Sequence, residues 1–120
     1  MASLLERLGG RDGVAVVIAG LVGRIRADPR LIGRCAGVAR LRHEQHLAEY
    51  VGAILEGVPR QAFAFRAPRG RPPDAAAIEL FLDHLADTLV AAGVSSRLSD
   101  DVVRAVTRAC DDLTWDEIFG

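Results

Sequence analysis

The sequence of 120 residues predicts one all-α domain spanning residues 1–120. Apolar residues recur at three- and four-residue spacings in four long segments, which is typical of helices that bury one face. No segment shows the alternation of apolar and polar residues that a half-buried strand requires. Serine, aspartate, glycine and proline separate these segments, as expected where helices begin and end. A chain of this length is expected to bury a single apolar core.

Composition and charge exclude several classes of protein. Half of the residues are apolar and 26% are charged, which is typical of a compact domain and not of a disordered chain. The net charge of −1 offers no attraction to nucleic acid or to an anionic membrane, and no apolar run is long enough to cross a bilayer. Cys35 and Cys110 lie far apart and no signal peptide is evident, so we expect a cytoplasmic protein with two free thiols. We expect a monomer or a homodimer.

The first two helices are predicted from their capping residues. Ser3 can cap a short helix that runs to Leu8, and Gly9-Gly10 ends it. Asp12 is expected to cap the second helix, which ends at Asp28-Pro29. The buried face of that second helix is predicted to consist of Val14, Val17, Ile18, Leu21, Val22 and Ile25.

Three further helices are predicted, with a long irregular segment between the first and second of them. One helix is expected over residues 38–56 and ends near Gly57. Residues 60–73 contain four arginines and three prolines, and the prolines oppose a regular helix. A helix is expected from Asp74 to Gly93, and Ser99 is expected to cap the last helix. The inward faces of these last two helices are predicted to be Ile78, Phe81, Leu82, Leu85 and Leu89, and Val102, Val103, Val106, Cys110 and Leu113.

Four short segments occur in an order and at a spacing that indicate a family. They are residues 3–10 (SLLERLGG), 27–31 (ADPRL), 37–41 (GVARL) and 84–94 (HLADTLVAAGV). Together they resemble the group I truncated haemoglobins, with Leu5 standing where tyrosine is usual. The resemblance covers the chain except residues 60–73. It implies a truncated globin, in which two pairs of helices stack as a two-over-two sandwich around haem.

The resemblance also implies a haem ligand that this sequence lacks. The family ligates iron through a histidine just before a glycine-rich segment. Counting back from His84, which matches a position not used for iron, places the ligand at Pro68, or one residue away at Ala67 or Arg69. None of these side chains is a neutral iron ligand. The resemblance therefore predicts a globin that has lost its proximal histidine.

Other haem contacts of the family are changed as well. The phenylalanine that packs on the ring corresponds to Cys35 or Arg34, and the distal tyrosine corresponds to Val22. Gln45 can match the distal glutamine. The residues expected to line the former haem cavity, or a pocket for another apolar ligand, are Val22, Cys35, Leu41, Glu44, Gln45, Ala48, Phe65, Pro68, Phe81 and Leu82.

Residues 60–73 can contribute to such a cavity in two ways. Phe63 and Phe65 can fold into the vacated space. Arg66, Arg69 and Arg71 can bind a carboxylate or a phosphate, because guanidinium groups match the geometry of both anions. The alternative is a solvated charged loop.

The helix predicted over residues 38–56 carries the remaining candidate site. His43 and His46 lie one turn apart, and His43 is the one expected to face inward, beside Tyr50. Glu44 falls among apolar positions, where a carboxylate without a partner is costly. It can pair with Arg40, or it can form an acid/base cluster with His43 and Tyr50.

Three functions follow from these expectations. The first is a binding protein with a globin fold and no conventional haem, whose cavity is closed or holds another small apolar ligand. The second is a haem protein with non-standard ligation through His43. The third is a globin-derived enzyme of a biosynthetic pathway that uses Glu44, His43 and Tyr50. No metal site other than His43 with haem is predicted.

Overall fold

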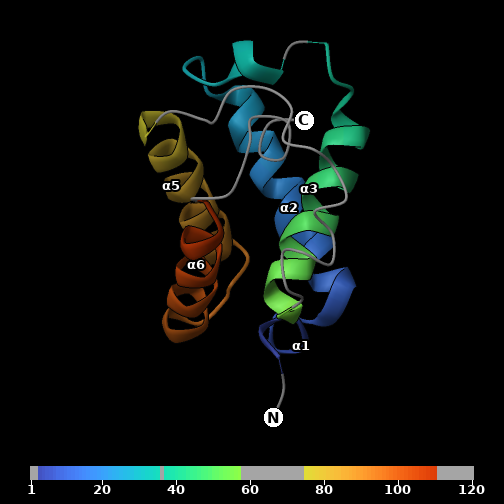
Figure 1. Ribbon diagram of the computed structural model, residues 1–120, viewed down its shortest axis with the longest axis vertical. Helices are drawn as coiled ribbons and strands as arrows, with labels where there is room; N and C mark the ends of the chain where they lie inside the picture. The colour runs from blue at the N-terminus through green and yellow to red at the C-terminus, as the bar shows by residue number, and fades with distance from the viewer. Residues whose placement is uncertain (1–2, 36, 58–74, 111–120) are drawn as a thin grey trace.

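The computed structural model describes residues 3–35, 37–57 and 75–110, and these ranges contain helices and no strand. Figure 1 shows the helices with their labels. Their bounds are α1 Leu4–Arg7, α2 Gly10–Ala27, the 3-10 turn η1 Ile32–Cys35, α3 Arg40–Glu56, α5 Ala75–Ala91 and α6 Ser96–Cys110. The predicted all-α class is confirmed.

The four long helices form two packed pairs. Helix α2 packs on α3, and α5 packs on α6. The pairs meet where α2 touches α5 and where α3 touches α6, while α1 closes one end against α2, α3 and α6. Figure 1 shows α2 and α3 on one side of the molecule and α5 and α6 on the other. This arrangement is the predicted two-over-two sandwich.

The start of α2 lies three residues earlier than the sequence predicts, since its N-cap is Gly9 and not Asp12. Ser3 caps α1 as predicted, since its Oγ accepts a hydrogen bond from the Glu6 N–H at 3.2 Å. Helix α2, however, begins at Gly10, and Asp12 lies in its first turn and does not cap it. Gly9 (φ 107°) and Gly10 (φ 72°) both adopt positive φ, so the chain turns tightly into α2 without an aspartate cap.

Gly13 is required by the close approach of the α1 end to α2. A Cβ atom at this position would lie 2.1 Å from the carbonyl oxygen of Leu8. We expect Gly13→Ala to lower the free energy of unfolding by about 1–3 kcal/mol, because the backbone of the α1–α2 turn must shift to relieve the overlap. Urea denaturation followed by circular dichroism measures this change. An alanine variant as stable as the parent would show that the turn does not lie where the structure places it.

The other helix ends follow the sequence signals, with one exception. Asp28 is the C-cap of α2, and Gly57 (φ 84°) and Gly93 (φ 80°) follow α3 and α5 in the left-handed conformation that glycine permits. The predicted cap at Ser99 is wrong, because α6 begins at Ser96. The Leu98 N–H instead donates to Ser95 Oγ at 3.3 Å, and Ser99 is buried in the first turn.

The core lies between the two helix pairs. All six residues of the predicted α2 stripe are buried. On α5 the stripe is rotated slightly, so that Ile78 and Leu82 are only partly buried while Ala77 and Thr88 are buried. On α6, Val102 and Val106 are buried, Val103 is partly buried, and the Cys110 side chain and Leu113 lie outside the described residues.

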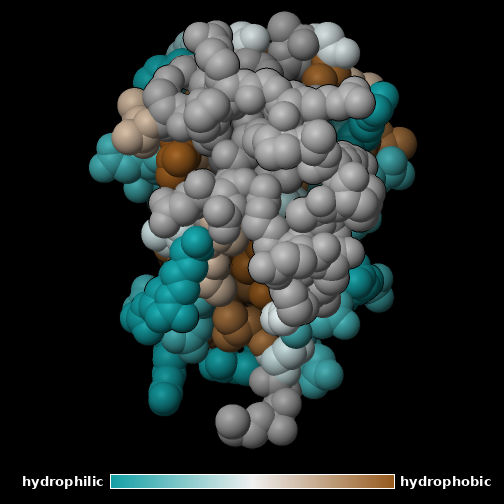
Figure 2. All heavy atoms as spheres, viewed as in Figure 1, coloured by the Kyte–Doolittle hydropathy of each residue, from teal (hydrophilic) through white to brown (hydrophobic). Residues whose placement is uncertain are grey.

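Figure 2 shows apolar residues along the seam between α6 and the α2–α3 pair, with hydrophilic residues on both sides. No described helix is long and apolar enough to span a membrane.

Candidate functional site

The three histidines of the chain occupy two helices. His43 lies on α3 and is fully buried, as its expected inward direction requires. His46, one turn later, is partly buried. His84 lies on α5, in the pair of helices opposite α3. Among the described residues, no group of three or more histidine, cysteine, aspartate and glutamate side chains could hold a metal ion.

His84 belongs to a charged cluster that joins the end of α2 to α5. The Asp28 carboxylate is only 4% exposed, and its Oδ2 lies 2.7 Å from His84 Nε2. The Arg30 guanidinium donates to both carboxylate oxygens, at 3.0 Å from Nε and 2.9 Å from an Nη, and the Arg30 backbone N–H donates at 2.8 Å. These donors hold the pKa of Asp28 well below its usual range, with the Arg30 side chain as the largest cause and His84 as the next. Asp28 therefore fixes the position of α5 against α2.

The polar residues of α3 include one ion pair within the helix. The Glu44 carboxylate accepts a hydrogen bond from Arg40 Nε at 3.2 Å, one turn earlier on the same helix. This contact is the pairing with Arg40 that the sequence offered for Glu44. His43 and Tyr50 are both buried and lie two turns apart on the same helix.

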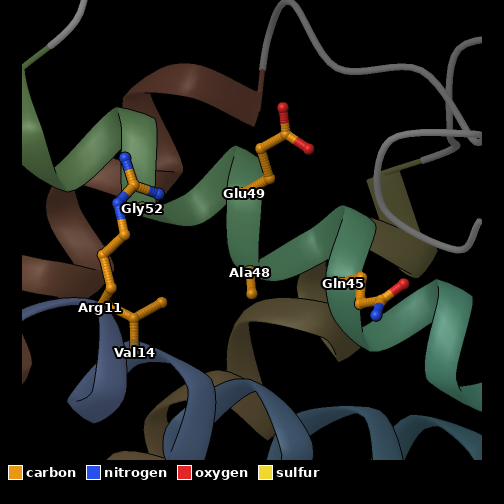
Figure 3. Close-up of a pocket in the computed structure, with 6 residues that line it drawn as sticks. All are labelled: Arg11, Val14, Gln45, Ala48, Glu49 and Gly52. Carbon is orange, nitrogen blue, oxygen red and sulfur yellow. The ribbon is translucent and has the colours of Figure 1, made fainter.

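A pocket of about 280 Å³ lies between the start of α2 and the outer face of α3. Its lining residues are Arg11, Val14, Gln45, Ala48, Glu49 and Gly52. Figure 3 shows Arg11 rising from α2 toward Gly52, while Gln45, Ala48 and Glu49 follow one another along α3. The pocket thus has an apolar floor of Val14, Ala48 and Gly52 and charged or polar groups around it.

The two charged residues that line this pocket differ in their ion-pair partners. Arg11 pairs with Glu56 at 3.4 Å, but both side chains are well exposed (66% and 47%), so the pair contributes little to stability. Glu49 is exposed and forms no ion pair with any part of the chain that the structure describes. Arg11 and Glu49 are thus the two charged residues that line the pocket, and of these two only Arg11 has an ion-pair partner among the described residues.

Gly52 is a helix-interior residue at a position where the backbone does not need glycine. A Cβ atom there would meet only Arg11 Nη1, at the ordinary contact distance of 3.5 Å. We expect Gly52→Ala to raise the free energy of unfolding by about 0.5–1 kcal/mol, because alanine restricts the unfolded chain and favours the helix. Thermal denaturation tests this expectation, and a loss of stability would mean that α3 is packed more tightly here than the structure shows.

Comparison with known proteins agrees with this architecture. No family model matches the chain. The group 1 truncated haemoglobin GlbN of Mycolicibacterium paratuberculosis is 29% identical over 118 residues, which are 97% of this chain and 87% of that protein. The chain is a homologue of this group 1 truncated haemoglobin. The truncated haemoglobin of Tetrahymena pyriformis in its Fe(III) form superposes with a TM-score of 0.78 at 15% identity, over 94% of this chain and 98% of that one. A variant of the same protein gives a TM-score of 0.79 at 16% identity.

The residues predicted to line a haem cavity lie partly in the core of this protein and partly on its surface. Val22 and Phe81 are buried, and Leu82 is partly buried. Leu41, by contrast, is 64% exposed, because it lies on the outer face of α3 in its first turn. Only Gln45 and Ala48 of the predicted set line the pocket. The side chain of Cys35 and residues Phe65, Pro68, Arg66, Arg69 and Arg71 lie outside the described parts of the chain.

Four pocket residues were missed by sequence reasoning. The sequence predicts Val14 only as a core residue, and it singles out neither Arg11 nor Glu49. Gly52 carried the one available signal, since a glycine inside a helix weakens it and often has a packing or functional reason.

Proposed function

We propose that this truncated-haemoglobin homologue is a small-ligand binding protein that does not hold haem through a proximal histidine. Globin homologues bind small ligands, and the relatives named above are haemoglobins. In this proposal the protein has the fold of those relatives, its interior is closed, and the small pocket on α3 binds the ligand in place of a haem cavity.

The donor set of this chain does not fit histidine-ligated haem, and this observation carries the proposal. Haem iron in proteins takes an axial histidine, cysteine, methionine or tyrosine. Residues 58–74, between α3 and α5, contain none of these four residue types. His84 lies on α5 with its Nε2 against Asp28, and His43 is buried within α3. No histidine is therefore available between α3 and α5, where the family resemblance expects the ligand.

The packing of the described core supports a closed interior. Val22, His43 and Phe81 come from α2, α3 and α5, and each is at most 1% exposed. The pocket on α3 has a volume near the lower end of the range for small-molecule sites, about 300–1,000 Å³, so it suits a ligand much smaller than haem.

Absorbance of the purified protein tests this proposal. Expression with excess haem is expected to yield a protein without a sharp Soret band. The group 1 GlbN relative, expressed and purified in the same way, serves as the positive control. A sharp Soret band of equal intensity in both proteins would refute the proposal.

His43 supports a second candidate, a haem protein with non-standard ligation. Its imidazole is fully buried on the helix that carries Gln45, so a rearranged α3 could turn it toward a haem. If a Soret band appears, this candidate predicts that His43→Ala shifts the band, whereas His84→Ala leaves it in place. An unchanged spectrum in His43→Ala would eliminate this candidate.

A further inference from the structure

We propose that the pocket between α2 and α3 binds a small α-amino acid with an apolar side chain. The carboxylate of the ligand would pair with Arg11, its ammonium group with Glu49, and its side chain would lie on the floor of Val14, Ala48 and Gly52. This inference rests on the proposed function, because Gln45 and Ala48 match positions that the resemblance assigns to a haem cavity.

The charges favour a ligand that carries both signs. Arg11 reaches α3 at Gly52 (Figure 3). Glu49 lies three residues earlier on that helix, which corresponds to a backbone rise of about 4.5 Å. An α-amino acid carries its carboxylate and its ammonium group on the same carbon, so its two charges lie close together. Glu49 is the one acidic residue that lines the pocket, and it forms no ion pair with any described residue, so an ammonium group would neutralise it.

Arg11 can accept a carboxylate without losing its present partner. A guanidinium group has five N–H donors, and its contact with Glu56 is a single exposed one at 3.4 Å. A ligand carboxylate can therefore bind the remaining donors. A ligand with an amine alone would face Arg11 with no compensating charge, and a simple carboxylic acid would face Glu49.

The floor of the pocket favours a short apolar side chain. Val14 is 2% exposed, Ala48 is partly buried, and Gly52 carries no side chain, so the floor is lined by small apolar groups. The Arg11 guanidinium lies beside this floor, because its Nη1 is 3.5 Å from the position that a Cβ of Gly52 would take. The pocket volume suits a side chain of the size of leucine.

Chemical-shift perturbation of the full-length, haem-free protein tests the inference with leucine as the probe. Isoamylamine and 4-methylpentanoate serve as matched probes that lack the carboxylate and the ammonium group. Leucine is expected to shift the backbone amide signals of Ala48, Glu49 and Gly52 in a saturable way, with a Kd on the order of millimolar. Each matched probe is expected to bind about two- to fivefold more weakly, the effect typical of an exposed ion pair.

Variants distinguish the pocket from general charge effects. Arg11→Gln and Glu49→Gln are expected to weaken leucine binding about two- to fivefold, and Gly52→Val more than about tenfold. The controls are Arg104→Gln and Glu79→Gln, which remove exposed charges from α6 and α5. Circular dichroism of each variant verifies that the helices are intact.

Three results would overturn the inference: no saturable shift with leucine, equal binding of leucine and either matched probe, or equal weakening by the control variants. The absorbance experiment is independent of all three. A protein that binds neither haem nor leucine contradicts this inference alone, and one with a sharp Soret band contradicts the proposed function.

Discussion

Phe81→Ala is expected to lower the free energy of unfolding by about 3–5 kcal/mol, because it empties a large volume in the middle of the core. Phe81 is 1% exposed and is the largest fully buried side chain among the described residues. It lies on α5, which packs against both α2 and α6. The remaining side chains come from rigid helices, so they can collapse only partly into the space.

Val90→Ala is the matched control for that experiment. Val90 lies on the same helix but is 69% exposed, so its truncation is expected to change stability by less than about 0.5 kcal/mol. Urea denaturation of both variants measures the difference. If the two variants were equally stable, Phe81 would not fill the interior, and the closed-cavity part of the proposed function would fail.

Asp28→Asn is expected to destabilise the protein at neutral pH and to make its Tm depend less on pH in the acid range. The variant leaves Arg30 and His84 without the carboxylate that joins them, so its Tm is expected to fall by several degrees at pH 7. The pKa of Asp28 is lower in the folded state than the usual value of about 3.9. Its stabilisation is therefore complete above about pH 5 and is lost as the pH falls through the folded-state pKa.

The pH dependence separates this charge effect from a loss of packing. The difference in Tm between the parent and Asp28→Asn is expected to be largest near neutral pH and to shrink steadily below about pH 4. Glu79→Gln, which removes an exposed carboxylate from α5, provides the control. It is expected to leave the decrease of Tm at low pH unchanged. A difference that stays constant down to pH 2 would show that the Asp28 charge is not the cause.

The helices were predictable because their signals are local. The α2 stripe, the stops at Gly57 and Gly93 and the cap at Ser3 depend on residues within a few positions of one another. The two wrong cap predictions concern helix starts at which more than one residue can begin the helix. Asp12 follows a glycine pair that turns the chain by itself, and Ser99 follows Ser95, which accepts the capping hydrogen bond.

The candidate site was harder to predict because its contacts join distant segments. Asp28 and His84 are 56 residues apart, and nothing in either local sequence indicates that they meet. Arg11 and Gly52 come from different helices, so their contact depends on how α2 packs on α3. Glu44 could be placed near Arg40 because both are on one helix, four residues apart.

The central claim is that the globin fold persists without histidine-ligated haem, and a hemin titration tests it most directly. Ferric hemin is added stepwise to the purified protein while the absorbance between the Soret and visible regions is recorded. The account predicts a broad, weak band like that of free hemin, with no break at one equivalent. A sharp Soret band that saturates at one hemin per chain, together with the electron paramagnetic resonance signal of a histidine-ligated ferric haem, would contradict it.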